Sequence, residues 1–461
     1  MASWTVVKTF FAPSLLTDQG WCSASVLSVD AEGMISNIAP GASKDCDVSL
    51  QGVVIPGMIN LHSHAFQRSL VGKTGLRGSG DDSFWSWRQA MYQQVAQLSP
   101  EAIEAVSAYC YMELLKGGYT TVAEFHYLHH QKGGVHYANP AETSMRVLTA
   151  ADAAGIGVTL LPVLYSWAGF GQQPLTEQQL PFRHDLNSYL RLLAQLDQYC
   201  ENSKLFDWGV APHSIRAVSE SQLQELMVGL AQLNFKGPIH IHIAEQQREV
   251  KDCVDYYGAS PVRWLLDKLP VNDRWCLIHA THVDSQELKM MRTADVVAGL
   301  CPTTEADLGD GIFPASQWQH LGGAWGIGSD SNLCVNATEE LRWLEYGQRL
   351  QDQQRNLLAA PGQLVGAELY KNALAGGLQA LAKPKARGFA VGQRADMLVL
   401  DQEHTLFLNK EKDQILDAWI FAGVQDMLSQ VWVGGRCVVE AGEHINAGRI
   451  ETDWRQLLKS K

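Results

Sequence analysis

The feature of this 461-residue sequence that most limits its fold is a regular alternation of short apolar runs with longer stretches of helical composition. Eight runs read as strands: 56–64, 120–127, 157–165, 208–215, 238–245, 275–282, 295–302 and 324–331. Apolar strands separated by helices, here for example 101–116 and 219–234, are typical of a parallel sheet covered by helices. Eight such units predict an α/β fold, with a closed, TIM-like (β/α)8 barrel over residues 56–387.

The two ends of the chain have a different pattern. Residues 1–55 and 388–461 contain short alternating segments broken by glycines, for example 395–401 and 431–439. Short strands joined by glycine-containing turns are typical of hairpins. We expect both ends to form one small β-sandwich domain beside the barrel, which requires the two termini to approach each other.

Composition limits the classes of partner. With 46% hydrophobic residues the chain can bury a large core. Its net charge of −13 argues against nucleic acid or an anionic membrane surface as the main partner. An anionic small substrate would therefore have to be bound by local arginines. No window approaches the eighteen or so apolar residues that a membrane helix needs.

Nine cysteines are scattered along the chain without a C-x-x-C pair, and their number is odd. We therefore expect reduced thiols and a cytoplasmic location. The N-terminus shows no basic segment followed by a long apolar core and a cleavage site, as a secretory signal peptide would.

Histidines stand at the ends of two predicted strands. His62 and His64 are two residues apart, so both side chains lie on one face of a strand and can bind one ion. His240 and His242 repeat this spacing, and Glu245 follows just beyond that strand. Each histidine alone is more often a core or surface residue, but the repetition within one predicted barrel favours a metal site.

Two further strand ends extend this pattern, with His279 in the sixth strand and Asp330 in the eighth. Three neutral imidazoles and one carboxylate suit a divalent ion such as Zn²⁺, with one position left open for water. Such an ion lowers the pKa of water, and Glu245 is placed to move the proton. The fourth strand has no Lys or Glu that could bridge two ions, so one metal is favoured.

The chain resembles the amidohydrolase superfamily in PGMINLHSH (56–64), HIAE (242–245), His279, Ser329-Asp330 and the 395–401 strand. Within it, the chain is similar to the formimidoylglutamate deiminases. The segments that carry this similarity are HAFQR (64–68), SFWSWR (83–88), APHSIR (211–216) and CPTTEADLGDG (301–311). The first similarity spans nearly the whole chain, whereas the second rests on these loops.

The resemblance implies a role for each site residue. Metal ligation falls to His62, His64, His242 and Asp330, and catalysis to Glu245, His279 and Asp330. Substrate binding falls to Gln67, Arg88, Tyr127, His213 and Arg216. Elementary chemistry supports the arginines, because a substrate with two carboxylates suits planar, permanently charged guanidinium groups.

Other interpretations of single residues stay open. An arginine alone is more often a solvated surface group. Tyr127 could be only a strand-end aromatic residue, and Gln67 only a polar residue at a helix start. His126, His240 and His282 are interpreted as core histidines or as residues that support the ligands.

The resemblance implies hydrolysis of N-formimino-L-glutamate to N-formyl-L-glutamate and ammonia in histidine degradation, and often a homodimer. One alternative is a deaminase of guanine or a related ring, which needs no paired arginines. The other is a scaffold of the same fold that has lost catalysis. Asp307 and Asn332 stand where the family often has Asn and His, which bears on fine substrate preference.

Overall fold

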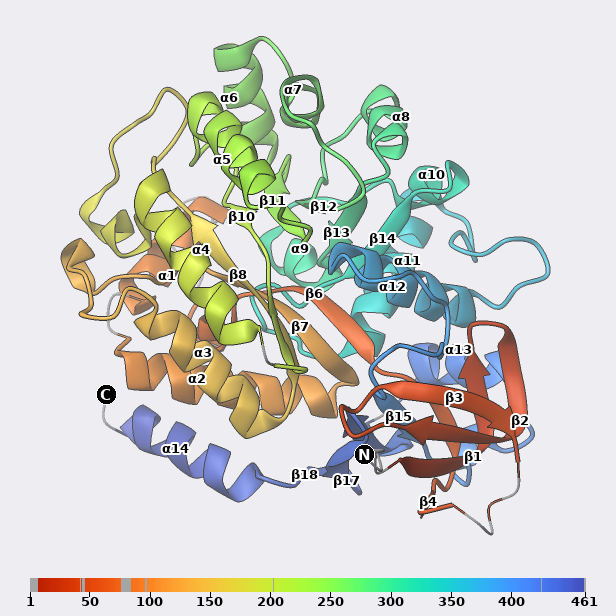
Figure 1. The fold of residues 1–461 in the computed structure, drawn as a ribbon. Coiled ribbons are helices and arrows are strands. Elements are labelled where there is room, and N and C mark those ends of the chain that lie inside the picture. The colour runs from red at the N-terminus through yellow and green to blue at the C-terminus, as the bar shows by residue number, and fades with distance from the viewer. Residues whose placement is uncertain are drawn as a thin grey trace.

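The computed structural model describes residues 7–41, 43, 46–75, 84–95, 98–201, 203–423 and 425–459. Ser83 of the 83–88 segment and the first six residues lie outside this part of the chain. Parallel strands gather in the middle of the molecule with helices around them, and a separate sheet lies to one side (Figure 1). This is an α/β fold.

Each of the eight predicted runs contains a strand. The strands are β6 (Met58–Ser63), β7 (Tyr119–His126), β8 (Gly157–Leu164), β9 (Phe206–Trp208), β10 (Ala211–Pro212), β11 (Ile239–Ile243), β12 (Trp275–His279), β13 (Val297–Leu300) and β14 (Ala324–Ile327). The fourth run holds two short strands, β9 and β10. Between them the N–H of Val210 donates to the carbonyl of Pro238, just before β11, and the N–H of Ala211 donates to the hydroxyl of Tyr189 instead of to β8.

These strands pair as two parallel sheets. One has the order β10-β8-β7-β6, with β9 also on β8, and the other has the order β11-β12-β13-β14. Isolated parallel bridges join the sheets at both sides. Val210 pairs with Ile239 and Ser214 with His242 on one side, and Ser63 pairs with Asp330 on the other.

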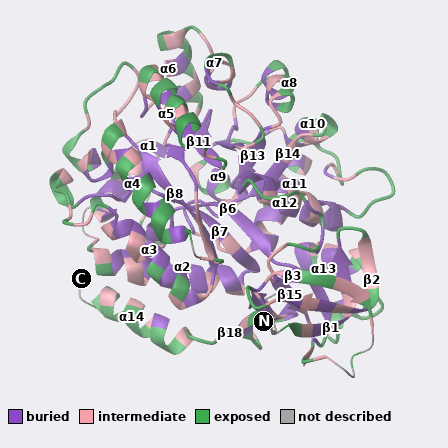
Figure 2. Ribbon diagram, viewed as in Figure 1, coloured by how far each residue is buried: buried purple, intermediate pink, exposed green. Residues whose placement is uncertain are grey.

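The helices that lie between these strands in the chain, and the two that follow β14, present buried faces to the sheets and exposed faces to solvent (Figure 2). They are α1 (Phe84–Val95), α2 (Pro100–Lys116), α3 (Glu142–Ala154), α4 (Leu186–Cys200), α5 (Glu220–Gln232), α6 (Gln247–Tyr257), α7 (Pro261–Lys268), α8 (Ser285–Thr293), α9 (Pro302–Leu308), α10 (Ala315–His320), α11 (Ala337–Asp352) and α12 (Val365–Ala380). Short 3-10 segments are η2 (Ala65–Leu70), η3 (Lys132–Gly134) and η4 (Glu177–Phe182).

Both ends of the chain contribute strands to the separate sheet. Its order is β18-β17-β16-β15-β5-β1-β2-β3, with β4 on β1. These strands are β1 (Lys8–Thr17), β2 (Gly20–Val29), β3 (Ile35–Pro40), β4 (Val48–Ser49), β5 (Val53–Pro56), β15 (Met397–Leu400), β16 (Leu428–Val433), β17 (Arg436–Glu440) and β18 (Glu443–His444). The junction is β5, which runs parallel to β1 and antiparallel to β15.

The helical elements not yet named lie in the C-terminal part of the chain, after β15. They are α13 (Asp413–Ala422), α14 (Ala447–Lys459), η5 (Thr405–Phe407) and η6 (Gln425–Met427). The terminal sheet has its own apolar cluster, which includes Phe10, Leu15, Val54 and Trp432. None of the helices in the described part of the chain is both long enough and apolar enough to cross a membrane.

Candidate metal centre and active site

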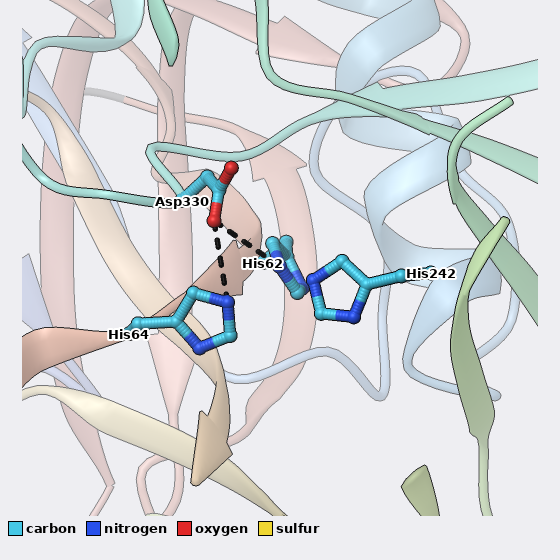
Figure 3. Close-up of side chains that lie close together, drawn as sticks. All are labelled: His62, His64, His242 and Asp330. Atoms are coloured by element: carbon cyan, nitrogen blue, oxygen red, sulfur yellow. Dashed lines mark ion pairs between the residues drawn. The ribbon is translucent and has the colours of Figure 1, made fainter. Parts of the chain in front are cut away.

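The carboxyl ends of the central strands bring distant residues of the chain together. His62 lies in β6 and His64 just after it, His242 lies in β11, and Asp330 follows β14. Figure 3 shows the three imidazoles and the carboxylate facing a common point. One possible ligand atom from each residue lies within 4.8 Å of the others. Because all four residues are buried, this group is enclosed within the protein.

Short distances define this group. Asp330 Oδ1 lies 3.4 Å from His62 Nε2 and 3.3 Å from His64 Nε2. The ring centroid of His62 lies 4.7 Å from that of His64 and 4.7 Å from that of His242, and the other two rings are 5.5 Å apart. Gly328, just after β14, can pack closely against His62 because it has no side chain. A Cβ at this position would lie only 2.8 Å from the His62 backbone oxygen.

The hydrogen bonds of these histidines fit a divalent metal. His64 Nδ1 donates to the carbonyl of Phe125 at 2.8 Å, and His242 Nδ1 donates to that of His213 at 3.1 Å. In both rings Nδ1 then carries the proton, and Nε2 has a lone pair that can bind an ion. Metal-binding histidines are usually held in this way, by a hydrogen bond from the ring nitrogen that does not bind the metal. Both ring nitrogens of His62 are buried without a hydrogen-bond partner. A buried nitrogen without a partner is costly unless an ion binds it.

The protonation states also fit. Burial lowers the pKa of His62 to about 3 and also lowers the pKa of His64, so both rings are neutral near pH 7. Burial alone would raise the pKa of Asp330, but the polar ring of His62 and the protonated ring of His279 beside it hold the pKa of this carboxyl below its ordinary value. The group therefore offers neutral imidazoles and an ionised carboxylate, the forms that bind a metal.

Glu245 and His279 lie beside this group. His279 Nε2 is 3.8 Å from Glu245 Oε1 and 3.7 Å from Asp330 Oδ2. Burial raises the pKa of Glu245 above its ordinary value, although His279 and Arg216 oppose the shift. Burial opposes protonation of His279, but Glu245 and its other carboxylate neighbours raise the pKa of this ring. A carboxyl group that titrates closer to neutral pH can both accept and donate a proton.

A cavity opens onto these residues. Of the residues assigned a role from the sequence, it is lined by His64, Gln67, Arg88, Tyr127, His213, Arg216, His242, Glu245, His279 and Asp330. His62 lies beneath the others and is fully buried. The structure thus brings together all of the residues that the sequence places in the site.

The two arginines reach the cavity from different elements. Arg88, in α1, stacks over the ring of Trp85 at 4.5 Å. Arg216, after β10, is almost fully buried, and its Nε lies 3.5 Å from Glu249 Oε1 and its Nη2 3.8 Å from Glu245 Oε2. The Arg216 Nε has no hydrogen-bond partner. Two guanidinium groups therefore face one cavity, where they can bind carboxylates.

Three neutral polar residues, Gln67, Tyr127 and His213, also line the cavity. Gln67 Nε2 donates to the Tyr127 hydroxyl at 2.8 Å, while Gln67 Oε1 is buried without a partner. The ring of His213 lies 4.7 Å from that of Tyr165, and burial lowers its pKa. These groups can donate and accept hydrogen bonds to a small polar ligand.

Several residues of the site were not singled out from the sequence. Glu305 accepts a hydrogen bond from His279 Nδ1 at 3.2 Å and fixes the orientation of that ring. It lies within the 301–311 segment, but the sequence does not show which of the polar residues there faces His279. Further aromatic residues wall the cavity: Phe84, Trp87, Tyr92, Tyr165 and Phe182. Phe84, Trp87 and Tyr92 lie on one face of α1 at helical spacing, a signal that could have indicated them, whereas Tyr165 follows β8 and Phe182 ends η4, where no such spacing applies.

The remaining histidines and the two departures from the family pattern lie outside the group of ligands. His126 Nε2 bonds to Thr143 and His240 Nε2 to the carbonyl of Ala380. His282 is not among the residues that line the cavity, and Asp307 is exposed. Asn332 is buried and supports Asp330, because its Nδ2 donates to the Asp330 carbonyl at 2.9 Å.

Comparison with known proteins gives consistent matches. The sequence profile of the amidohydrolase family matches residues 53–438. A formimidoylglutamate deiminase from Pseudomonas aeruginosa is 48% identical over 98% of this chain and 99% of its own. The crystal structure of an amidohydrolase from Brucella melitensis superposes with a TM-score of 0.93 at 42% identity, covering 98% of this chain and 99% of that one. An adenosine deaminase from Xanthomonas campestris with bound zinc shares the fold, with a TM-score of 0.80 at 19% identity and 98% coverage of both chains.

Proposed function

The chain belongs to the amidohydrolase family, and from this premise we propose that it hydrolyses N-formimino-L-glutamate to N-formyl-L-glutamate and ammonia in histidine degradation. It is then a hydrolase that acts on a C–N bond of a linear amidine. Similarity to the P. aeruginosa deiminase over nearly the whole chain supports this substrate. The structural observation that carries the proposal is that Arg88 and Arg216 line the same cavity as the histidine and aspartate group.

One divalent ion, most simply zinc, would be held by His62, His64, His242 and Asp330. Imidazole nitrogens with one carboxylate oxygen are a common zinc-binding set in catalytic sites. When bound, the ion would lower the pKa of a water molecule towards neutrality and so supply the nucleophile. The unpartnered nitrogens of buried His62 support this assignment.

Glu245 would transfer the proton, and His279 and Asp330 would position the attacking water. Water adds to the formimino carbon, the bond from that carbon to the terminal nitrogen breaks, and the carbonyl of the formyl group forms as ammonia leaves. Glu245 accepts a proton from the attacking water and delivers it to the departing nitrogen. His279 and Asp330, 3.7 Å apart, orient the water, and Glu305 holds the His279 ring in place.

Arg88 and Arg216 would bind the two carboxylates of the substrate, and Gln67, Tyr127 and His213 would contact its polar groups. A guanidinium can bind a carboxylate through two parallel hydrogen bonds, which fixes both distance and orientation. Positioning the formimino carbon beside the nucleophile in this way contributes to the rate. The overall charge of −13 makes these local cations necessary for a dianionic substrate.

We further propose that the two parallel sheets close as one (β/α)8 barrel over residues 56–387. The isolated bridges Val210–Ile239 and Ser63–Asp330 support closure. Residues 1–55 and 388–461 would form the second domain, a β-sandwich. Free thiols at buried cysteines such as Cys110, Cys200 and Cys276 support a reducing, cytoplasmic compartment. A homodimer stays a prediction from the resemblance.

A substrate panel tests the proposed function. Metal-loaded protein is assayed for ammonia release from N-formimino-L-glutamate, guanine, adenosine and cytosine. We expect release from N-formimino-L-glutamate with a kcat/KM at least about a hundredfold above any ring substrate, because only the former presents two carboxylates to the arginines. Comparable or faster release from a ring would support the alternative deaminase, and no release from any compound would support a scaffold without catalysis.

A further inference from the structure

Glu249 is a buried carboxylate that lies behind the wall of the candidate active site. It belongs to the first turn of α6 and is only 1% exposed. It is not among the residues that line the cavity. A buried carboxylate is costly unless hydrogen bonds or a cation compensate its charge. The groups that compensate this charge therefore indicate the role of Glu249.

One oxygen of Glu249 holds the main chain of Glu245. Its Oε2 accepts a hydrogen bond from the N–H of Glu245 at 3.1 Å. This N–H directly follows Ala244, which adopts a positive φ angle of 50°. A residue other than glycine keeps such a conformation only where the surrounding structure holds it. Glu249 therefore supports the turn that leads from β11 to Glu245.

The other oxygen of Glu249 faces a substrate-binding arginine. Its Oε1 lies 3.5 Å from Arg216 Nε. Both atoms are buried and have no hydrogen-bond partner among the described residues, so the ion pair is their main compensation. Burial opposes the charge of Arg216, but Glu249 and Glu245 raise the pKa of this guanidinium above its ordinary value. Glu249 thus helps to keep a cation at the cavity.

Arg216 can contact Glu249 and a ligand at the same time. A guanidinium has five N–H donors, so contact of Nε with Glu249 leaves the donors of both Nη atoms for other partners. Nη2 lies 3.8 Å from Glu245 Oε2, and Arg216 lines the cavity. Holding one edge of the guanidinium sets the direction from which a carboxylate can bind to it.

We propose that Glu249 is a positioning residue, which fixes Arg216 and the main chain of Glu245 relative to each other. This inference rests on the proposed function, in which Arg216 binds a substrate carboxylate and Glu245 transfers the proton. A substrate held by Arg216 then presents its formimino carbon at a set distance from Glu245. Reaction rates depend steeply on such distances, so Glu249 contributes to the rate without touching the substrate.

Binding of glutarate, a dicarboxylate without a formimino group, tests the position of Arg216 independently of turnover. Zinc-loaded wild type and Glu249→Gln are titrated with glutarate by calorimetry. An amide has one acceptor oxygen where a carboxylate has two, so the variant cannot keep both contacts. We expect the dissociation constant to rise at least about tenfold, because Arg216 is no longer held. Equal affinities would overturn the proposal.

Asp396→Asn is the matched control. Asp396 also pairs with a mostly buried arginine, since its Oδ1 accepts from Arg394 Nε at 2.8 Å, but it does not line the cavity. Its glutarate affinity should stay within about threefold of the wild type even if the protein is less stable. Equal losses of affinity in both variants would show that instability causes the effect, and would overturn the proposal.

Turnover gives a second readout. For N-formimino-L-glutamate, we expect Glu249→Gln to raise KM and to lower kcat, each by on the order of tenfold, because both partners of Glu249 are displaced. The zinc content should equal that of the wild type. A change in only one of the two constants would overturn the proposed link between Arg216 and Glu245.

A crystal structure of the wild type with zinc and glutarate needs no variant, so it decides the question even if Glu249→Gln does not fold. We expect a glutarate carboxylate on the Nη atoms of Arg216, with Nε still beside Glu249. A complex in which Arg216 has left Glu249 would overturn the proposal. Wild type that binds glutarate but releases no ammonia from N-formimino-L-glutamate would contradict the proposed function alone. Wild type that does not bind glutarate would contradict both.

Discussion

At the scale of single residues, Glu245 is the group on which the proposed proton transfer depends. It is buried between His279 and Arg216, whose opposing charges keep part of its population ionised despite burial. Replacing Glu245 with Gln keeps the shape and removes the titrating group. We expect kcat for N-formimino-L-glutamate to fall by on the order of 10² or more, with an unchanged metal content.

The control for this substitution is Glu225→Gln on the exposed face of α5, which should leave kcat unchanged. Steady-state ammonia release and elemental analysis on the same samples separate the two effects. If Glu245→Gln retained turnover within about threefold of the wild type, Glu245 would not be the proton carrier.

The sequence predicts residues that repeat a spacing or end a strand, but it does not predict those placed by loops. His62, His64 and His242 could be found because alternate strand residues share a face. Glu305 could not be assigned to His279, since this contact depends on how the turn after β13 directs α9. Tyr165 and Phe182 were missed for the same reason, because they follow no periodic pattern, whereas Phe84, Trp87 and Tyr92 share one face of α1 and could have been found from their helical spacing.

At the scale of secondary-structure elements, local capping explains where several helices begin. Ser219 caps α5, accepting from the N–H of Gln222, and the Gln222 side chain accepts from the N–H of Ser219. This capping box agrees with the helix predicted over 219–234, although α5 ends two residues earlier, at Gln232.

Ser219→Ala removes one side of this box. We expect a loss of about 1 kcal/mol in the free energy of unfolding, because the N–H of Gln222 loses its acceptor. Urea denaturation of the metal-loaded protein measures it. Gln224→Ala, in the exposed part of the same helix, is the control and should change the stability by less than about 0.5 kcal/mol. Equal effects of the two substitutions would show that the cap does not stabilise α5.

Strand positions were more predictable than strand lengths. Each apolar run contains a strand, yet the sixth run, 275–282, yields only β12, which ends at His279. His279 and Ala280 both adopt positive φ angles, 67° and 46°, so the strand cannot continue through them. This turn directs His279 into the site. An apolar pattern does not reveal such a turn, because it depends on contacts with neighbouring strands.

At the scale of the whole molecule, buried carboxyl groups connect stability to pH. Glu340, in α11, is fully buried, and burial raises its pKa to about 8 although Thr303 donates hydrogen bonds to it. In the unfolded chain this proton is lost near pH 4.5. Between these values the folded state binds one more proton than the unfolded state. Stability should therefore fall as the pH rises from about 4.5 to 8.

Glu340→Gln should remove this contribution. We expect the stability of the wild type relative to the variant to fall by on the order of 1 kcal/mol or more between pH 5.5 and pH 8. Urea denaturation across this range measures the difference, and Glu339→Gln, on the more exposed neighbour, should show no such trend. A wild-type-to-variant difference that stays constant with pH would contradict the assigned pKa.

Strands from the two ends of the chain meet where β5 pairs with β15. The register between them, Val54 opposite Val399, could not be predicted because it depends on contacts between segments more than 300 residues apart.

The proposed function requires one cavity to combine a metal held by His62, His64, His242 and Asp330 with arginines that bind N-formimino-L-glutamate. Ammonia release from this substrate, measured before chelation, after chelation and after reloading with zinc, tests this requirement. We predict that turnover disappears when the metal is removed and returns with zinc, with N-formyl-L-glutamate as the product. Turnover that persists in fully stripped protein, or its absence in fully loaded protein, would contradict the proposed function.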